Sequence, residues 1–217
     1  MSAAPRGLRI AILISGRGSN MLAIAHAVRA EEIHGRIVAV LSDKADAAGL
    51  AAAGQLGIHT ETCLPQAGRS REEYDRALAA AIRAHSPDVV VLAGFMRILS
   101  AGFVQDFAGR LLNIHPSLLP KHRGLHTHRR VLEAGEPEHG CTVHFVTEEL
   151  DGGPLIVQAR VPVLPGDTVA SLSARVQTQE HRIYPMTLQW LASGRLEWRD
   201  GAGWLDGRRL DQPVVLR

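Results

Sequence analysis

Residues 8–20 read LRIAILISGRGSN, and this stretch points to an α/β protein. Its first eight residues, Leu8 to Ser15, are nearly all apolar, which is typical of a strand covered by other elements on both faces. The glycine-rich residues that follow predict a turn into a helix that begins near Met21.

The chain up to residue 114 continues this alternation of short apolar runs and longer amphipathic runs. Further strands are expected at residues 37–42, 58–62, 89–93 and 111–114. Helices are expected at residues 45–55 and 70–85, the second opened by a capping box of Ser70 and Glu73, with a short helix capped by Ser100. This rhythm predicts an open, mostly parallel, twisted sheet with helices on both faces, in which ligands bind at the carboxyl ends of the strands.

The second half of the chain has a different pattern. Residues 141–146 and 155–163 resemble strands joined by a turn-rich segment, which predicts antiparallel or mixed strands there. Thr168 is expected to cap a helix through about Trp190, kinked at Pro185, and the segment around Asp206-Gly207 is expected to form a small hairpin. Because no repeat or linker divides the chain, a single domain over residues 1–217 is expected.

The composition excludes several classes of protein. The 217 residues are 46% hydrophobic and 21% charged, with 24 Lys and Arg against 22 Asp and Glu, so charge alone predicts no nucleic-acid partner. Cys63 and Cys141 are too few for a disulfide framework and favour a reducing compartment. No apolar run is long enough for a membrane span, and the first nine residues lack the features of a leader, so we expect a soluble cytoplasmic protein with no membrane partner.

The loop Gly16-Arg17-Gly18-Ser19-Asn20 is a candidate anion site. Where a strand turns into a helix, backbone N–H groups and the helix dipole favour a phosphate. The loop lacks the third glycine of a dinucleotide fingerprint and the Lys-Ser/Thr ending of a P-loop. A phosphate contact is therefore favoured over a nucleotide cofactor, and a purely structural glycine turn stays open as an alternative.

Two other segments could carry catalysis. Asn113 and His115 follow the fifth expected strand and alternate to the same side, where an amide and an imidazolium could both donate hydrogen bonds to an oxyanion. Asp151, in the turn Asp151-Gly152-Gly153-Pro154, could hold and charge a histidine. By themselves, a strand-end histidine can be structural, and these turn residues favour an ordinary hairpin turn with a solvated Asp.

No metal site is predicted from the histidines of residues 122–128. Their spacing matches no recognised zinc pattern, so a basic loop that touches an anionic substrate, or a solvated surface, explains them better. His144 lies inside an expected strand, where a hydrogen-bonded core histidine is the default interpretation.

Together these motifs resemble the phosphoribosylglycinamide formyltransferases, from about Leu8 to Leu210. The resemblance rests on ISGRGSN (14–20), AGFMRIL (93–99), NIHPSLLP (113–120) and ELDGGP (149–154). The Asn-x-His pair with a downstream Asp is common to folate-dependent formyl-transfer enzymes. GxGSN (16–20) and QTQEH (177–181) point to the branch that acts on glycinamide ribonucleotide.

The resemblance implies transfer of a formyl group from 10-formyltetrahydrofolate, a co-substrate, to the amine of glycinamide ribonucleotide, without a metal. It implies a ribonucleotide-phosphate half at about residues 1–100 and a folate and catalytic half at about 101–217, in a monomer or weak homodimer. The implied catalytic residues are Asn113, His115 and Asp151. The implied ribonucleotide-binding residues are Gly18, Ser19, Asn20, Gln177 and Glu180. The implied folate-binding residues are Arg71, Met96, Arg97, Ile98, Leu99, Asn113, Thr147, Glu148, Glu149, Leu150 and Asp151.

Two departures and three alternatives accompany this resemblance. Arg17 stands where many relatives have an uncharged residue, and His122-Arg123 replaces what is often an aromatic residue followed by proline. Formyltetrahydrofolate deformylase is the nearest alternative, but the first strand begins too early for its usual N-terminal regulatory domain. Methionyl-tRNA formyltransferase normally adds a large C-terminal domain, and a nucleotide-binding regulatory module has no need for the three catalytic residues.

Overall fold

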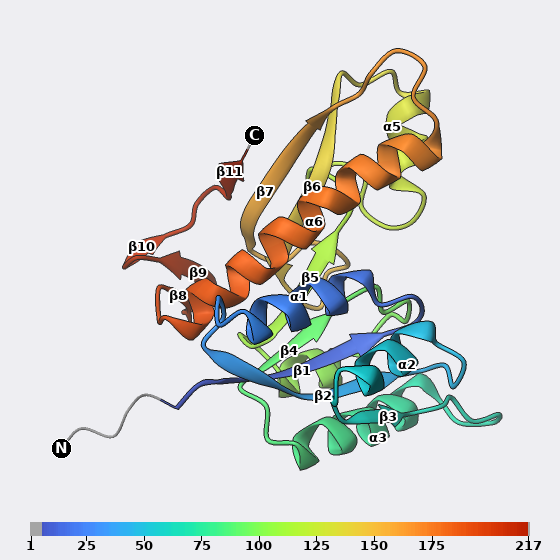
Figure 1. Ribbon diagram of the computed structural model, residues 1–217, viewed down its shortest axis with the longest axis vertical. Helices are drawn as coiled ribbons and strands as arrows, with labels where there is room; N and C mark the ends of the chain where they lie inside the picture. Colours follow the sequence, from blue (N-terminus) through green and yellow to red (C-terminus); the bar gives the residue numbers. More distant parts are fainter. Residues whose placement is uncertain (1–5, 217) are drawn as a thin grey trace.

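The computed structural model describes residues 6–216 and centres on one large sheet. The parallel strands of its first half are β1 (Leu8–Ile14), β2 (Gly35–Ser42), β3 (Thr60–Thr62), β4 (Val89–Leu92) and β5 (Leu111–His115). Three later strands join them: β6 (Glu138–Phe145), β7 (Leu155–Pro162) and β11 (Val214–Leu216). The sheet order is β11-β7-β6-β5-β4-β1-β2-β3 (Figure 1). The predicted open, mostly parallel α/β sheet is confirmed.

The strands of the second half are mixed in direction, as predicted. β6 runs antiparallel to both β5 and β7, whereas β11 pairs with β7 in parallel. No strand was expected at β11, because its three residues carry too little pattern to be distinguished from a loop. The connections change sides between β1 and β4, so the parallel strands place a ligand crevice at their carboxyl ends there.

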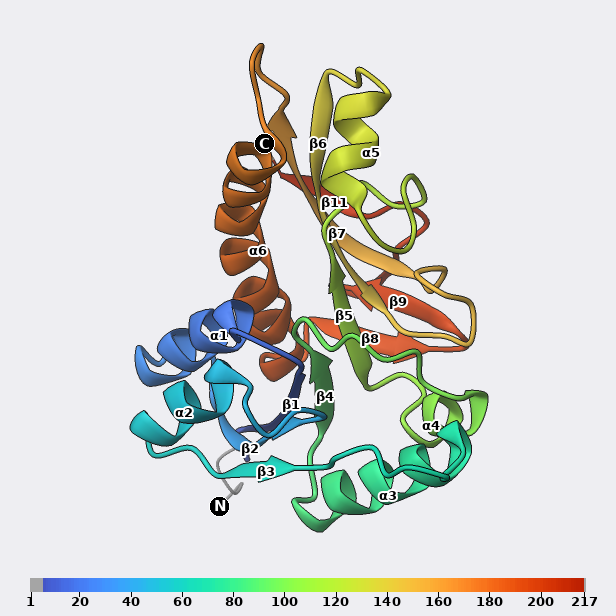
Figure 2. The ribbon, with the colours of Figure 1, turned by 90° about the vertical axis from the view of Figure 1, so that its right-hand side faces the viewer.

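Helices cover both faces of the sheet (Figure 2). Helices α1 (Ser19–Arg29), α2 (Ala48–Gln55), α5 (Thr127–Glu133) and α6 (Val169–Ala192) pack into one core, and α3 (Arg71–Ala84) and α4 (Ala101–Asp106) into the other. In β1, Ile12 belongs to the first core and Leu13 to the second, and both are fully buried. Each contributes about 1.5–3 kcal/mol by leaving water. The prediction of a strand covered on both faces is confirmed.

The helix ends follow the predicted capping signals. The Ser70 hydroxyl accepts a hydrogen bond from the Glu73 N–H, and the Glu73 carboxylate accepts one from the Ser70 N–H, which completes the capping box of α3. The Ser100 hydroxyl caps α4 by accepting from the Phe103 N–H, and Thr168 forms a capping box with Ser171 at the start of α6. Helix α6 continues through Pro185 to Ala192, so the proline expected to kink it does not interrupt it (Figure 1).

The C-terminal segment forms a second, smaller sheet. Its antiparallel strands are β8 (Leu196–Arg199), β9 (Ala202–Leu205) and β10 (Arg208–Arg209), so the predicted hairpin has a third strand. The ring of Trp198 packs edge-on against Phe145 with 4.9 Å between centroids. This contact packs the small sheet against the end of β6.

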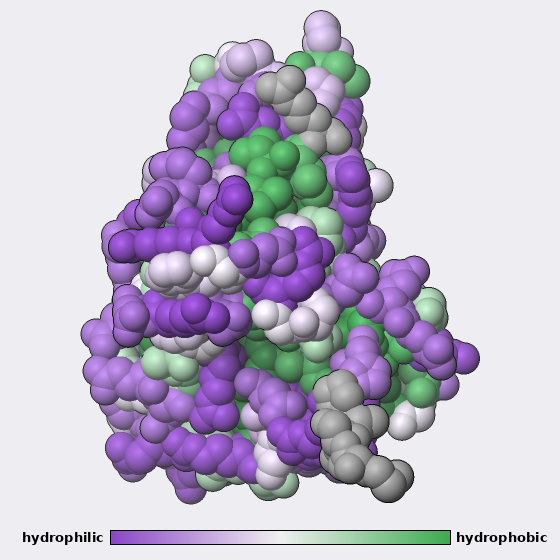
Figure 3. Space-filling model, turned by 90° about the vertical axis from the view of Figure 1, so that its left-hand side faces the viewer, coloured by the Kyte–Doolittle hydropathy of each residue, from purple (hydrophilic) through white to green (hydrophobic). Residues whose placement is uncertain are grey.

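The surface carries many polar side chains, as expected for a chain in which 21% of the residues are charged (Figure 3). Figure 3 shows a face that is mostly hydrophilic and interrupted by smaller apolar areas. Within residues 6–216, none of the helices is both long and apolar enough to cross a membrane. The expectation of no leader concerns residues 1–9, of which residues 1–5 lie outside the described part of the chain.

Tyr184 holds α6 against the neighbouring strands β4 and β5. Its side chain is fully buried, and its hydroxyl lies 3.0 Å from the Leu92 carbonyl oxygen and 3.1 Å from that of Leu112. Burial raises the pKa of this phenol well above 10, so it stays a donor at every physiological pH.

Replacing Tyr184 with phenylalanine is expected to lower the free energy of unfolding by about 1–3 kcal/mol, because buried carbonyl acceptors lose their donor. Urea unfolding measures the change. Tyr74→Phe is the control, since that hydroxyl donates to the single carbonyl of Cys63 in a partly buried position. Equal losses in the two variants would show that the hydroxyl of Tyr184 has no special role.

Candidate active site

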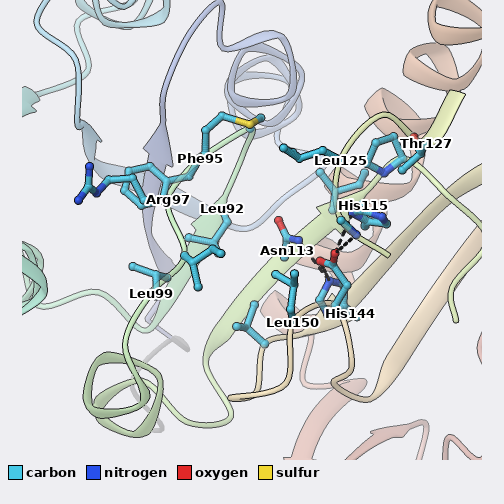
Figure 4. Close-up of a pocket in the computed structure, with 18 of the residues that line it drawn as sticks. Leu92, Phe95, Arg97, Leu99, Asn113, His115, Leu125, Thr127, His144 and Leu150 are labelled. Carbon is cyan, nitrogen blue, oxygen red and sulfur yellow. Dashed lines mark hydrogen bonds and ion pairs between the residues drawn. The ribbon is translucent and has the colours of Figure 1, made fainter. Parts of the chain in front are cut away.

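A cavity of about 540 Å³ opens at the carboxyl ends of β4 and β5. Three loops line most of it, at residues 94–99, 124–129 and 146–151. The volume is within the range of small-molecule sites, and the position is the one predicted for a parallel sheet. Figure 4 shows Asn113, His115 and His144 converging in this cavity, away from Arg97 and Leu99.

Asn113 and His115 both project from β5 into the cavity, as their alternation predicts. Asn113 lies opposite His144 of β6 in the antiparallel register. The Asn113 Nδ2 donates to His144 Nε2 over 3.2 Å, while the other ring nitrogen of His144 donates to the Phe145 carbonyl over 2.9 Å. Burial lowers the pKa of His144, which keeps its Nε2 free to accept. The neutral ring thereby fixes the orientation of the Asn113 amide.

His115 is buried between two acceptors. Its Nε2 donates to the His122 carbonyl oxygen over 2.9 Å, and its Nδ1 lies 3.4 Å from Asp151 Oδ2. Asp151 Oδ2 also accepts from the Gly124 N–H at 2.9 Å, which holds the carboxylate in place. Only the imidazolium form carries a proton on both nitrogens and can satisfy both acceptors. The structure thus brings the three residues of the predicted catalytic group together.

The turn that presents Asp151 depends on Gly153. A Cβ atom at Gly153 would lie 1.9 Å from the carbonyl oxygen of Phe145, so no other residue fits there. The close approach at Gly153 is to the end of β6, which fixes the turn against the strand that carries His144.

The basic loop at residues 121–123 is paired with carboxylates. Lys121 and His122 contact Glu136 over 2.9 and 2.7 Å, and Arg123 pairs with Glu149 across the cavity mouth. These three side chains are therefore engaged within the protein, and the Arg123 pair links two of the segments around the cavity. Sequence reasoning left this loop as either a substrate contact or a solvated surface, and it did not foresee these partners.

The predicted ribonucleotide-binding residues meet where α1 packs against α6. Gln177 Nε2 donates to the Ser19 hydroxyl over 3.0 Å, and Asn20 Nδ2 donates to Glu180 Oε2 over 2.8 Å. Gly18 takes a left-handed conformation, with φ of 72°, just before α1. Burial raises the pKa of Glu180, partly offset by the bond from Asn20. The Asn20 Oδ1 is buried without a partner, which leaves an acceptor for a ligand.

The cavity collects ten of the eleven predicted folate-binding residues. Met96 and Ile98 expose more than half of their surface, and exposed apolar side chains grouped around a cavity mark a ligand site. Arg97 stacks on the ring of Tyr74 at 4.3 Å, and its Nε is buried without a partner. Arg71 is not part of the cavity lining and lies at the start of α3, beside Glu72.

Sequence reasoning missed some of the lining. His144 is a buried, hydrogen-bonded histidine, as predicted, but it also lines the cavity. Leu125 and Val169 were not singled out. The place of His144 in the cavity follows from its pairing with Asn113 on the neighbouring strand. The long segment between β5 and β6 prevents the sequence from showing which residues of the two strands are paired. For Leu125, 70% exposed, the signal was an apolar residue within a polar loop.

Comparison with known proteins agrees with the geometry. The formyl transferase family model matches residues 8–188. The chain is 60% identical to phosphoribosylglycinamide formyltransferase of Escherichia coli over 94% of this chain and 96% of that one. It is 46% identical to the Haemophilus influenzae enzyme of the same name, over 93% of this chain and 95% of that one.

Solved structures give the same result. Phosphoribosylglycinamide formyltransferase from Coxiella burnetii superimposes with a TM-score of 0.92 at 45% identity, covering 97% of this chain and all of that one. The resemblance inferred from the sequence motifs is thus confirmed by matches that run nearly end to end in both chains. This chain therefore belongs to the phosphoribosylglycinamide formyltransferase family.

Proposed function

We propose that this chain transfers the formyl group of 10-formyltetrahydrofolate to the amine of glycinamide ribonucleotide, with Asn113, His115 and Asp151 as its catalytic group. The observation that carries the assignment of these residues is their convergence in one cavity, with His115 held between Asp151 and a backbone carbonyl. Membership of the family supports the reaction itself.

The reaction begins when the amine nitrogen attacks the formyl carbon. A C–N bond forms, the carbonyl electron pair moves to oxygen, and the resulting oxyanion needs hydrogen-bond donors. The Asn113 amide and the His115 imidazolium supply them, and both project from the same strand. The intermediate then breaks its bond to N10 of the folate, which takes up a proton as the amine loses one.

To donate a hydrogen bond to the oxyanion, His115 must give up one of its present hydrogen bonds. In the structure its Nε2 donates to the His122 carbonyl, which occupies the place of an acceptor that the substrate would provide. Asp151 keeps Nδ1 engaged during that exchange and places a carboxylate beside the ring. The same carboxylate can position a water that relays the proton from the attacking amine to N10.

The ribonucleotide is assigned to the place where α1 packs against α6. The N–H groups at the start of α1, after Gly18, suit its phosphate, and the exposed Arg17 adds a positive charge beside that loop. Gln177 and Glu180 reach the same place from α6 and would hold the rest of the ribonucleotide.

The folate is assigned to the cavity itself. The apolar side chains of residues 94–99 suit the pterin ring, and Glu148, Glu149 and Leu150 close the opposite side. Arg71 remains assigned to folate only if the tail of that molecule extends beyond the cavity toward α3.

We also infer a single domain, because one sheet runs from β3 in the first half to β11 in the second. Of the two halves, the ribonucleotide-phosphate half at about residues 1–100 also contributes residues 94–99 to the folate cavity. We propose a cytoplasmic protein, since Cys63 and Cys141 are both free, and a monomer or weak homodimer. Sedimentation at several protein concentrations tests the last point.

The alternative activity is hydrolysis of 10-formyltetrahydrofolate. Incubating the protein with this folate, with and without glycinamide ribonucleotide, separates the two. We expect tetrahydrofolate to form only when the ribonucleotide is present, in equal amount to formylated ribonucleotide. Tetrahydrofolate and formate produced at the same rate without the ribonucleotide would identify a deformylase instead.

Glu180 offers a test of the proposed ribonucleotide-binding residues through pH. Its pKa is raised in the folded chain, so the stability it contributes is present below the ordinary value of 4.5 and is lost as pH rises through the folded value. Glu180→Gln removes this dependence. We expect its Tm to exceed that of the wild type above neutral pH, by about 2–4 °C for each kcal/mol of penalty removed, and to match it in acid.

The same variant should bind the ribonucleotide more weakly, raising its KM about tenfold or more, because a hydrogen bond to a charged group is lost. The KM for the folate serves as the internal control and should stay unchanged. An unaltered ribonucleotide KM, or a Tm difference independent of pH, would contradict this role for Glu180.

A further inference from the structure

A group of three metal-ligating side chains lies at the far edge of the sheet from the cavity. Glu61 lies in β3 and His59 directly precedes this strand, while His85 caps the C-terminal end of α3. One ligand atom from each lies within 4.8 Å of the others, and no other such group of three occurs in residues 6–216. Because β3 is four strands from β5, the group lies about 19 Å from the catalytic strand.

The chain brings the three together by simple geometry. His59 and Glu61 are two residues apart in extended backbone, so their side chains point to the same side. His85 Nε2 faces Glu61 Oε2 at 3.1 Å, and the rings of His59 and His85 lie 4.9 Å apart between centroids. Two imidazoles and one carboxylate thus converge from an edge strand and a helix end.

This set of donors suits a borderline-soft divalent cation. Two histidines and a glutamate are the protein ligands of many zinc sites that keep a fourth position open, whereas Mg²⁺ and Ca²⁺ prefer all-oxygen sites. At usual zinc bond lengths, tetrahedral ligand atoms lie about 3.4 Å apart, and the His85–Glu61 pair already meets that spacing. His59 is exposed, so its ring is free to turn inward by the remaining distance.

We propose that His59, Glu61 and His85 bind one Zn²⁺ ion, or a similar transition metal, at the outer edge of the sheet. The ion joins β3, which has three residues and only one neighbouring strand, to the end of α3. Its effect is therefore on the stability of this edge and not on formyl transfer. Without a metal, His85 and Glu61 form a hydrogen bond.

The test is a titration of the full, chelator-treated chain with ZnCl₂, followed by calorimetry and thermal unfolding. One equivalent should bind, and Zn²⁺ at 100 times its Kd should raise the Tm by about 5–10 °C. MgCl₂ at the same concentration should cause no shift. An equal rise in Tm with Mg²⁺, or no binding of Zn²⁺, would overturn the proposed site.

Variants locate the binding. His59→Gln and Glu61→Gln should each lower Zn²⁺ affinity at least about tenfold, with kcat unchanged, while His26→Gln on exposed α1 should change neither. His128 and His139, 2.9 Å apart beside the cavity, are the competing imidazoles. One equivalent bound with unaltered affinity in both His59→Gln and Glu61→Gln would assign the ion elsewhere and contradict the proposal.

Discussion

Replacing His115 with alanine is expected to lower kcat at least about 10²–10³-fold, because one of two oxyanion donors is lost. The loss includes more than a hydrogen bond, since the imidazolium also provides positive charge beside the developing oxyanion. Asp151 would be left buried with the Gly124 N–H as its remaining close donor. Steady-state rates with both substrates saturating measure the effect.

His26→Ala is the matched control, because this histidine is exposed on α1 and far from the cavity lining. Thermal unfolding of both variants checks that they are folded. Turnover of His115→Ala within a few-fold of the wild type would exclude His115 from the chemical step.

Replacing Asn113 with alanine is expected to cost a similar factor, about 10²–10³ in kcat, through loss of the second donor. Asn113→Asp is the sharper change. It keeps the size of the side chain but places an acceptor where the oxyanion develops, so its loss should be at least as large. Truncation of an exposed amide on α6, Gln189→Ala, should leave the rate unchanged.

Combining Asn113→Ala with His115→Ala tests whether the two donors serve one oxygen. Groups that act as a unit are not additive, so the double variant should lose less than the product of the single losses. Fully multiplicative losses would instead show that the two side chains contribute independently and do not act as a unit.

Most of the fold could be predicted from local signals. The strand at residues 8–14 is apolar on both faces because both of its faces are buried, and the caps at Ser70 and Thr168 are satisfied by residues three positions ahead. β11 could not be predicted, because its pairing with β7 is a long-range contact of a short strand. The third strand of the small sheet was missed although its pairings are local, because strands of two to four residues carry little pattern.

In the candidate site, too, some features could be predicted from local sequence and others depend on long-range contacts. Asn113 and His115 could be recognised because one strand sets their relative direction. The role of His144 depends on the register between β5 and β6, and the contact of His115 with the His122 carbonyl depends on the path of a loop. Neither leaves a local signal in the sequence. The zinc ligands share this property, since residues 61 and 85 meet only after α3 has formed.

The central claim, direct transfer of the formyl group to the ribonucleotide, is tested most directly by following the label. The protein is mixed with 10-formyltetrahydrofolate labelled in the formyl carbon, glycinamide ribonucleotide and an excess of unlabelled formate. We expect the label to appear undiluted in the formylated ribonucleotide, with one tetrahydrofolate formed for each. Label that is released as free formate, or product diluted by the unlabelled pool, would contradict direct transfer.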